Sequence, residues 1–338
     1  MPFTLSHPAF AAPIKKLVPS LSMTGLVLGS MAPDLEYYVA FETHRTIGHT
    51  YLGFLLMHIP LCVAFALAYH RLFKPTLPLL LPAFGRMDRI AAADSAAKWE
   101  LRTMRQWMRF LISLFIGFLT HLFMDGWTHR HTVFVNHFDK LRDEVGGFQL
   151  YKLLQYGFSV LGAAIIGLYL LYRWHRGYRR TLEGREDRCA VPITGKTSFR
   201  LMTFSVAAVV FAYKFSIAWD TTSLGFVFVA PFSAFMLGWL AAIWLRQVNG
   251  KRQLVRAGLK LACLALLAFL YQAATYWLDR YGYMRLNFDT WQEYDRLRTA
   301  MWLAYLWGLS ALLIVASRDM RTNSRLRTGC LQEENAIP

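Results

Sequence analysis

Seven long apolar segments constrain the fold of this chain more than any other feature of its sequence. An α-helix needs about 20 apolar residues in a row to cross the hydrocarbon core of a membrane. Segments of roughly that length lie at residues 51–73, 106–124, 153–172, 201–219, 224–245, 259–278 and 300–316. The first is the least regular, because it contains His58, Pro60 and His70. The sequence therefore predicts an all-α polytopic membrane helix bundle with about seven transmembrane helices.

The composition agrees with this prediction and argues against other classes of protein. Hydrophobic residues make up 55% of the 338 residues and charged residues only 17%, against about 25% charged residues in soluble globular domains. A disordered chain needs the opposite composition, so disorder is excluded and an ordinary cytosolic enzyme is not expected. The four cysteines form no CxxC pair, so neither a disulfide framework nor a thiolate metal site is predicted.

The positive charge gathers in every second loop between the apolar segments. The chain has 37 Lys and Arg against 21 Asp and Glu, a net charge of +16. Loops 71–105, 173–200 and 246–258 and the tail after residue 316 are basic, whereas the intervening loops are mixed or short. Cytoplasmic loops of membrane proteins carry such an excess. We therefore expect a bacterial inner-membrane protein with a cytoplasmic C-terminus. No basic run is interleaved with exposed aromatic residues, so no nucleic-acid partner is predicted.

The first 50 residues allow two arrangements. Residues 7–17 and 21–34 can form two short antiparallel helices joined by a turn at residues 18–20, which places His7 and Asp34 at the same end. Alternatively, residues 17–32 form one membrane span that separates His7 from Asp34. The Val-Pro-Ser turn favours the N-terminal helical hairpin.

Histidines and carboxylates gather in three motifs, PDLE at 33–36, THRTIGHT at 43–50 and HLFMDGWTHRH at 121–131. Segments 51–73 and 106–124 run antiparallel, so the ends that carry these motifs lie at one membrane face, predicted to be non-cytoplasmic. His121 and Asp125 are four residues apart, which places them on one helix face. Imidazole and carboxylate together suit zinc, or another first-row divalent ion such as manganese. A lone HxxxD pair also occurs as a structural pair between helices.

These motifs carry a resemblance to a known family. MPFTLSHPAF, GSMAPDLEYY, THRTIGHT and GFLTHLFMDGWTH resemble the bacterial integral-membrane family called domain of unknown function 4184, closely over residues 1 to about 135. That family is similar to predicted membrane-bound metal-dependent hydrolases, although relatives read THS where this chain has GHT. The motif order also resembles that of the zinc phospholipase C and P1 nuclease group. The later HxxxE element of that group is missing, because Leu141 follows His137 by four residues.

The motifs and the resemblance together give a set of candidate site residues. Asp34, His49, His121 and Asp125 are the predicted metal ligands, and His7 and His131 complete a second site in the ligand order that the resemblance implies. Glu36 is the predicted general base, because it lies two residues from a ligand. Arg45 or Arg130 is expected to neutralise a phosphate.

The favoured function is metal-dependent hydrolysis of a phosphoester or a lipid-linked substrate at the membrane face, with membrane lipid as the partner. The alternative is a non-enzymatic metal-binding scaffold or a transporter, so whether the protein is an enzyme stays open, as does its oligomeric state. Transport predicts ionisable groups along a path, and the later segments carry little besides Lys214. Residues 1–135 are predicted to form the metal-site region, 136–317 the rest of the bundle and 318–338 a cytoplasmic tail.

Overall fold

A computed structural model of the protein describes residues 4–42, 44–97, 99–183, 195–218, 224–248, 250–282 and 291–319. Within these residues, seven helices are long and apolar enough to cross a membrane, which confirms the predicted all-α membrane bundle. These spans are Tyr51–Leu80, Met104–Gly126, Leu150–Leu182, Lys196–Ile217, Phe226–Arg246, Lys251–Tyr281 and Trp291–Arg318. The chain is therefore a multi-pass membrane protein. Residues 320–338 of the predicted tail lie outside the described residues.

The chain divides into two compact units. The first unit comprises Met1–Glu36, Gly48–Cys62 and Trp99–Arg179, and the second comprises Tyr37–Ile47, Val63–Lys98 and Arg180–Pro338. The division does not follow the predicted boundary between residues 135 and 136, because the third span belongs largely to the first unit.

The N-terminal segment of the first unit is the predicted hairpin rather than a membrane span. It contains the 3-10 turn η1 (Thr4–Ser6) and helices α1 (Pro8–Ala11), α2 (Ile14–Leu17) and α3 (Met23–Met31), followed by the 3-10 turn η2 (Ala32–Asp34). Lys15 Nζ donates to the carbonyl oxygens of Pro19, at 2.9 Å, and Leu21, at 2.6 Å, which closes the turn. Ser22 caps α3 by accepting from the Gly25 amide at 3.3 Å. The first arm is two short helices because Pro13 lies between them.

The first span departs from a regular α-helix close to the residues that interrupt its apolar sequence. It runs through α5 (Tyr51–Gly53), the π-helical turn η3 (Phe54–His58), α6 (Ile59–Ala68), a second π-helical turn η4 (Tyr69–Phe73) and α7 (Lys74–Leu80). The boundary between the units falls within α6. Pro60 has no amide to donate to residue 56, and the widened turn η3 lies directly before α6, where it can absorb this loss.

The second span, α9 (Met104–Gly126), begins with a capping box. Thr103 Oγ1 accepts from the Gln106 amide at 3.3 Å, and Gln106 Oε1 accepts from the Thr103 amide at 3.1 Å. After α9 come α10 (Val133–His137), the 3-10 turn η6 (Asp139–Arg142), strands β1 (Glu144–Val145) and β2 (Phe148–Gln149), and the long helix α11 (Leu150–Leu182). Glu144 pairs with Gln149 and Val145 with Phe148. Gly146 and Gly147 have φ of 62° and 82°, as a two-residue hairpin turn requires.

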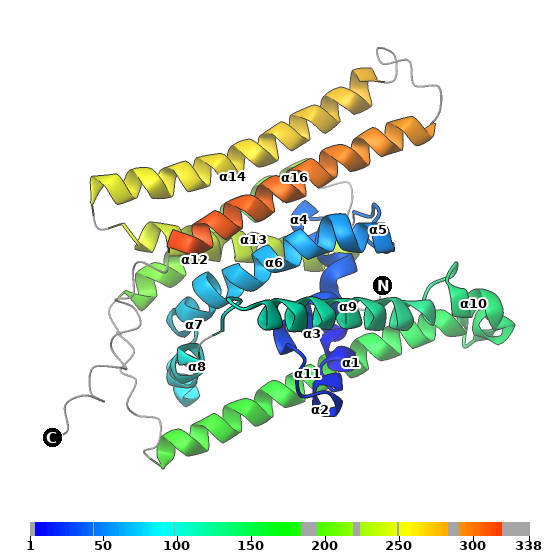
Figure 1. Ribbon diagram of the computed structural model, residues 1–338, viewed down its shortest axis with the longest axis horizontal. Helices are drawn as coiled ribbons and strands as arrows, with labels where there is room; N and C mark the ends of the chain where they lie inside the picture. Colours follow the sequence, from blue (N-terminus) through cyan, green and yellow to red (C-terminus); the bar gives the residue numbers. More distant parts are fainter. Residues whose placement is uncertain are drawn as a thin grey trace. The chain divides into compact units, whose positions relative to one another are not determined.

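Helices α3 and α9 lie side by side in the first unit (Figure 1) and approach closely at glycines. A Cβ atom on Gly29 would lie 2.1 Å from the Leu114 carbonyl oxygen, and one on Gly117 would lie 2.4 Å from that of Leu26. Small residues at a contact between membrane helices let the backbones approach in this way. His121 and Asp125 follow Gly117 at intervals of four, so this contact points them toward the end of α3.

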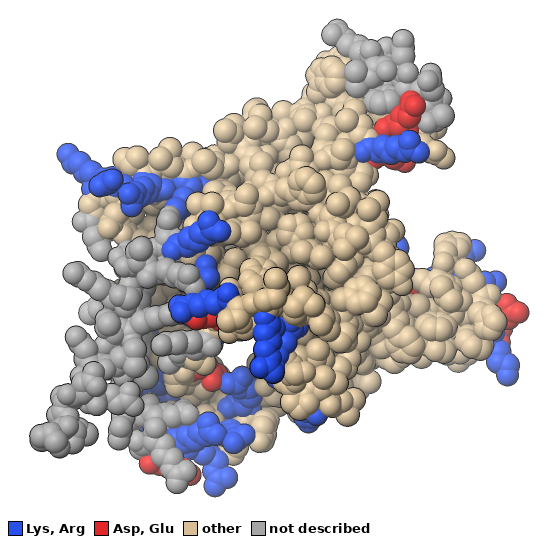
Figure 2. All heavy atoms as spheres, in the orientation of Figure 1, with Lys and Arg blue, Asp and Glu red and all other residues tan. Residues whose placement is uncertain are grey.

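The second unit contains the remaining elements. They are α4 (Leu35–Ala40), which begins in the first unit, η5 (Phe84–Arg86), α8 (Met87–Ala96), α12 (Lys196–Ala218), α13 (Leu224–Arg246), α14 (Lys251–Trp277), the π-helical turn η7 (Leu278–Gly282) and α16 (Trp291–Asp319). Its core gathers around Phe199, Ile243 and Trp244. Helices α14 and α16 lie side by side (Figure 1). Figure 2 shows charged side chains near both ends of this pair and other residues along its middle, as two membrane-spanning helices require.

Candidate metal centre

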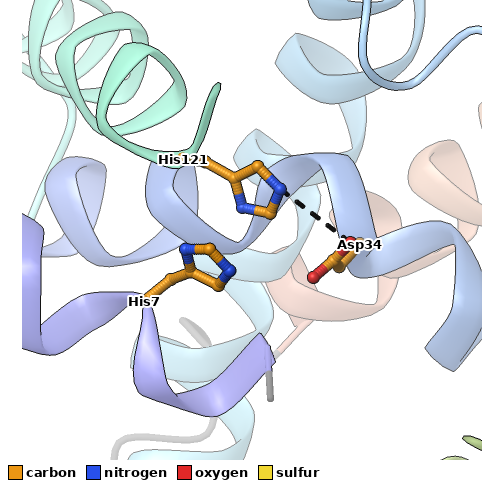
Figure 3. Close-up of side chains that lie close together, drawn as sticks. All are labelled: His7, Asp34 and His121. Atoms are coloured by element: carbon orange, nitrogen blue, oxygen red, sulfur yellow. Dashed lines mark ion pairs between the residues drawn. The ribbon is translucent and has the colours of Figure 1, made fainter. Parts of the chain in front are cut away.

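Five side chains of the predicted ligand set converge where α9 ends in the first unit. His7 precedes α1, Asp34 ends η2, His49 precedes α5, and His121 and Asp125 lie in the last two turns of α9. They form two overlapping groups, His7–Asp34–His121 and His49–His121–Asp125, in each of which the possible ligand atoms lie within 4.8 Å of one another. Figure 3 shows the first group, with His121 and Asp34 directed toward each other and His7 beside them.

The distances between donor atoms are short and centre on the two carboxylates. His121 Nε2 lies 3.3 Å from Asp125 Oδ2 and 3.9 Å from Asp34 Oδ1. His49 Nε2 lies 3.6 Å from Asp125 Oδ2 and 3.8 Å from Asp34 Oδ1, and His7 Nε2 lies 3.7 Å from Asp125 Oδ1. The rings of His7 and His121 are stacked with centroids 4.1 Å apart. Ligand atoms about 2.0–2.2 Å from one ion are themselves about 3–4 Å apart, so this spacing suits a shared ion.

Several of these buried atoms lack a hydrogen-bond partner. Among the described residues, neither ring nitrogen of His7 has one, and nor do Asp34 Oδ1, His121 Nε2 and Asp125 Oδ1. His7, Asp34 and His121 are each at most 1% exposed. Buried polar atoms without partners cost free energy, and their concentration in one place calls for an explanation. A divalent ion would satisfy one ring nitrogen of His7 together with the other three atoms.

A second layer of hydrogen bonds holds the ligands in place. Thr4 Oγ1 donates to Asp34 Oδ2 at 2.9 Å, which leaves Oδ1 directed at the cluster. His121 Nδ1 lies 2.8 Å from the Ser30 carbonyl oxygen, so this nitrogen carries the proton and Nε2 presents its lone pair. Metal-binding histidines usually have such a partner. The Ser30 carbonyl thus fixes both the tautomer and the ring orientation.

Glycine also positions the segment that carries His49. A Cβ atom on Gly48 would lie 2.7 Å from Glu36 Oε1 and 3.1 Å from the Pro33 carbonyl oxygen. His58 Nε2 lies 2.7 Å from the Gly48 carbonyl oxygen and donates to it. The GHT and PDLE motifs therefore pack directly on one another, and a larger residue at position 48 would push His49 away.

Burial shifts the proton equilibria of His7 and Asp34, two candidate ligands that lie outside the membrane spans. Burial raises the pKa of Asp34 to about 6, because the carboxylate has lost its hydration. Burial lowers the pKa of His7 well below its usual value, and the neighbouring imidazole of His121 lowers it further. His7 is therefore neutral at neutral pH, which is the form that binds metals. A cation would offset the cost of holding Asp34 ionised in this environment.

The structure does not bring all the predicted site residues together. His131 and Arg130 are exposed and line a separate hollow beside α10, so His131 lies outside both ligand groups. Glu36 is fully buried, with its Oε1 against the backbone of Gly48. Arg45 is exposed and belongs to the second unit.

Two histidines that were not predicted as ligands lie beside the centre. His129 Nδ1 lies 3.8 Å from Asp125 Oδ2 and 3.2 Å from the Asp125 carbonyl oxygen, outside both ligand groups. The signal was present, because His121, Asp125 and His129 are spaced by four and the last turn of α9 continues to Thr128 through its bond to Asp125. His58 lies within an apolar segment of the sequence, and only the folded chain reveals its bond to Gly48.

The centre has one partly open side. The side chains of His49 and His129 are 13% and 23% exposed, whereas those of His7 and Asp34 are 1% exposed and that of His121 is fully buried. Tyr51 and Phe54, at the start of the first span, contact Phe118 of α9. The cluster therefore lies at one end of both spans, with His49 and His129 toward the solvent side.

Comparison with known families places the chain in one of them. A family model described as a domain of unknown function (DUF4184) matches residues 1–267, so the chain belongs to this family. Comparisons with curated proteins and with solved structures found no match.

Proposed function

We propose that this member of the DUF4184 family binds a divalent metal ion, zinc or manganese, and uses it to hydrolyse a phosphoester or lipid-linked substrate at the membrane face. The observation that carries the proposal is the group of buried ligand atoms without hydrogen-bond partners around His121. A purely structural His–Asp pair would involve two residues, whereas here the possible ligand atoms of five residues lie in two overlapping groups, within 4.8 Å of one another in each.

His7, Asp34, His49, His121 and Asp125 would hold the ion. When bound, a divalent ion lowers the pKa of a coordinated water toward neutrality and polarises the ester oxygen. The two carboxylates balance the positive charge, and the Ser30 carbonyl and Thr4 hydroxyl keep His121 and Asp34 oriented. His129 stands at the open side near Asp125, where it can hold or give up a proton next to the substrate. The contact of Glu36 with Gly48 favours support of the His49 segment over the role of general base.

The place of the centre favours a substrate that reaches the membrane surface. It lies at the ends of the first two spans, and the loops at their other ends are basic. From the positive-inside rule we infer that the centre faces the non-cytoplasmic side of the bacterial inner membrane. A lipid headgroup or a lipid-linked phosphoester would reach it there without leaving the bilayer.

Metal analysis of the purified protein tests the proposal. We expect the protein, purified in detergent without chelator and with zinc supplied, to retain about one equivalent of metal per chain. Asp125→Ala should lose most of this metal and still insert, because the remaining ligands do not close the shell. His137→Ala, an exposed neighbour outside the cluster, should keep it. A metal-free parent protein would contradict the proposal.

Hydrolysis is tested separately, because a metal-binding scaffold would pass the metal test. Asp34→Ala and His121→Ala should abolish hydrolysis of a phosphodiester or phospholipid while the protein still inserts. Metal bound by the parent together with full activity in both variants would place the reaction elsewhere. Metal bound without hydrolysis of any phosphoester would favour the scaffold or transporter.

A further inference from the structure

A small hollow in the first unit is lined by residues of α10, η6, β2, the start of α11 and the turn after α9. Its volume is about 220 Å³, and it is lined by Arg130, His131, Asn136, Arg142, Gln149 and Tyr151. Pockets for drug-sized ligands measure about 300–1,000 Å³. The hollow therefore has room for one small polar group and not for a whole lipid.

The lining is positively charged. Two of the six lining residues are arginines and none is acidic. Arg130 makes no hydrogen bond or ion pair with any residue that the structure describes. Arg142 is held by bonds from Nε to the Val135 carbonyl oxygen, at 3.1 Å, and from Nη2 to Asn136 Oδ1, at 2.9 Å. Its ion pair with Asp139 is long, 3.9 Å, and that carboxylate is 93% exposed, so the charge of Arg142 is only weakly neutralised.

The uncharged lining residues are arranged as donors. Asn136 Oδ1 accepts from Arg142, which leaves the amide NH₂ group of Asn136 to donate. Gln149 Oε1 accepts from the Tyr151 hydroxyl at 2.6 Å, which likewise leaves the amide NH₂ group of Gln149 to donate. Guanidinium groups with additional N–H donors recognise phosphate oxygens well.

One short turn joins the hollow to the metal centre. His129 faces Asp125, and the next two residues, Arg130 and His131, line the hollow. Thr132 Oγ1 donates to the Gly126 carbonyl oxygen at 2.7 Å, which ties the turn back to the end of α9. Consecutive Cα atoms are about 3.8 Å apart, so the wall of the hollow and the open side of the centre are formed by neighbouring residues.

We propose that this hollow binds a phosphate group of the substrate and thereby selects phosphorylated substrates. That the bound phosphate belongs to the substrate rests on the proposed function. Binding of phosphate by the hollow does not depend on that function. The phosphate comes either from a lipid headgroup or from a soluble ester. Arg130 and Arg142 supply the charge, and Asn136 and Gln149 supply the directional donors.

Binding measured on metal-stripped full-length protein tests the proposal, because phosphate then cannot attach to a metal ion. The probes are inorganic phosphate and dihexanoyl phosphatidic acid, followed by phosphorus NMR line broadening and calorimetry in detergent. We expect Arg130→Gln to weaken binding of both probes about tenfold and Lys140→Gln to leave it unchanged. Lys140 is a matched control, because it is exposed in the same segment but does not line the hollow. Before the metal is stripped, the metal content should be the same in both variants.

The outcomes separate this proposal from the function it extends. Phosphate binding that is equal in the parent protein and in Arg130→Gln, or absent from both, overturns the hollow as a phosphate site even if the protein holds metal. Phosphate binding that depends on Arg130 supports the hollow even if the parent proves metal-free. Tighter binding of the lipid than of inorganic phosphate identifies a headgroup as the source, and equal binding identifies a soluble ester.

Discussion

Burial of the Asp34 carboxylate costs free energy when no cation neutralises it. Its carboxyl group is fully buried, accepts one hydrogen bond from Thr4 and has one oxygen without a partner among the described residues. Proton uptake and metal binding are the two ways to relieve this cost. In the proposed metal centre, protons and metal ions would therefore compete for the same carboxylate.

This competition gives a pH dependence with a definite sign. The pKa of Asp34 is raised by burial to about 6 from its ordinary 3.8. Between pH 4 and pH 6 the folded metal-free protein holds a proton there that the unfolded chain has released, so stability falls as the pH rises through this window. Thermal unfolding of metal-stripped protein should show this fall, and Asp34→Asn should remove it. Metal affinity should run the opposite way and weaken below pH 6. A stability that rises with pH in the parent relative to Asp34→Asn would contradict the assignment.

His58 acts one step away from the ligands. Its bond to the Gly48 carbonyl oxygen holds the segment of His49, and outer-layer partners of this kind typically change metal affinity by about 10–100-fold. We expect His58→Phe to weaken metal binding about tenfold, measured by competition with a coloured chelator. His58→Gln keeps an N–H donor and should restore much of the affinity. Equal affinity in all three proteins would show that His49 does not depend on this bond.

At the scale of secondary-structure elements, the contact between α3 and α9 brings the candidate ligands together. A methyl group at Gly117 would lie 2.4 Å from the Leu26 carbonyl oxygen and 2.7 Å from the Ser30 amide. Ser30 is also the acceptor for His121, so separation of the helices disturbs a ligand as well as the packing.

We therefore expect Gly117→Ala to cost about 1–3 kcal/mol of stability and to weaken metal binding. Gly157→Ala in α11 is the matched control, because a Cβ atom there meets nothing within 4 Å. That change should be neutral or slightly stabilising, since alanine favours a helix over glycine by about 1 kcal/mol. Thermal unfolding and metal content of the two variants check this. Equal stability and equal metal content in both would show that the contact does not position the candidate ligands.

The membrane elements were largely predictable from sequence, because hydropathy and length decide whether a helix can span a bilayer. Their ends were less predictable. Helix α11 continues to Leu182, ten residues beyond the predicted 172, because an arginine-rich segment can remain helical outside the apolar core. The π-helical turns in the first span were not predicted either, since Pro60 signals a disturbance without giving its form.

The candidate site was predictable where it depends on local spacing and not where it depends on contacts between distant segments. The i, i+4 spacing of His121 and Asp125 is a local property, and the antiparallel spans placed His49 at the same face. The position of His131 outside both ligand groups was not predicted, because it depends on how the chain turns after Gly126. The support from Thr4, Ser30 and His58 depends on contacts between distant segments, which the sequence alone does not fix.

At the scale of the whole molecule, the arrangement of charged loops predicts an orientation that reporter fusions can check. Fusions after residues 90, 188, 250 and 325 should report the cytoplasm, and a fusion near residue 140 should report the opposite side, because the basic loops alternate. Positions 188 and 325 lie outside the described residues, so these two fusions test the sequence pattern alone. A cytoplasmic signal at residue 140 would move the metal centre to the other face and remove the argument for a periplasmic substrate.

The bond between His121 and the Ser30 carbonyl limits how many ions the centre can hold. With Nδ1 protonated, the imidazole has a single lone pair, on Nε2, although both ligand groups include this residue. If the five side chains hold one ion as proposed, that ion would use this lone pair, and a second ion would have to bind without His121. We therefore expect a metal titration to show one strong step and a second, much weaker one, which is negative cooperativity.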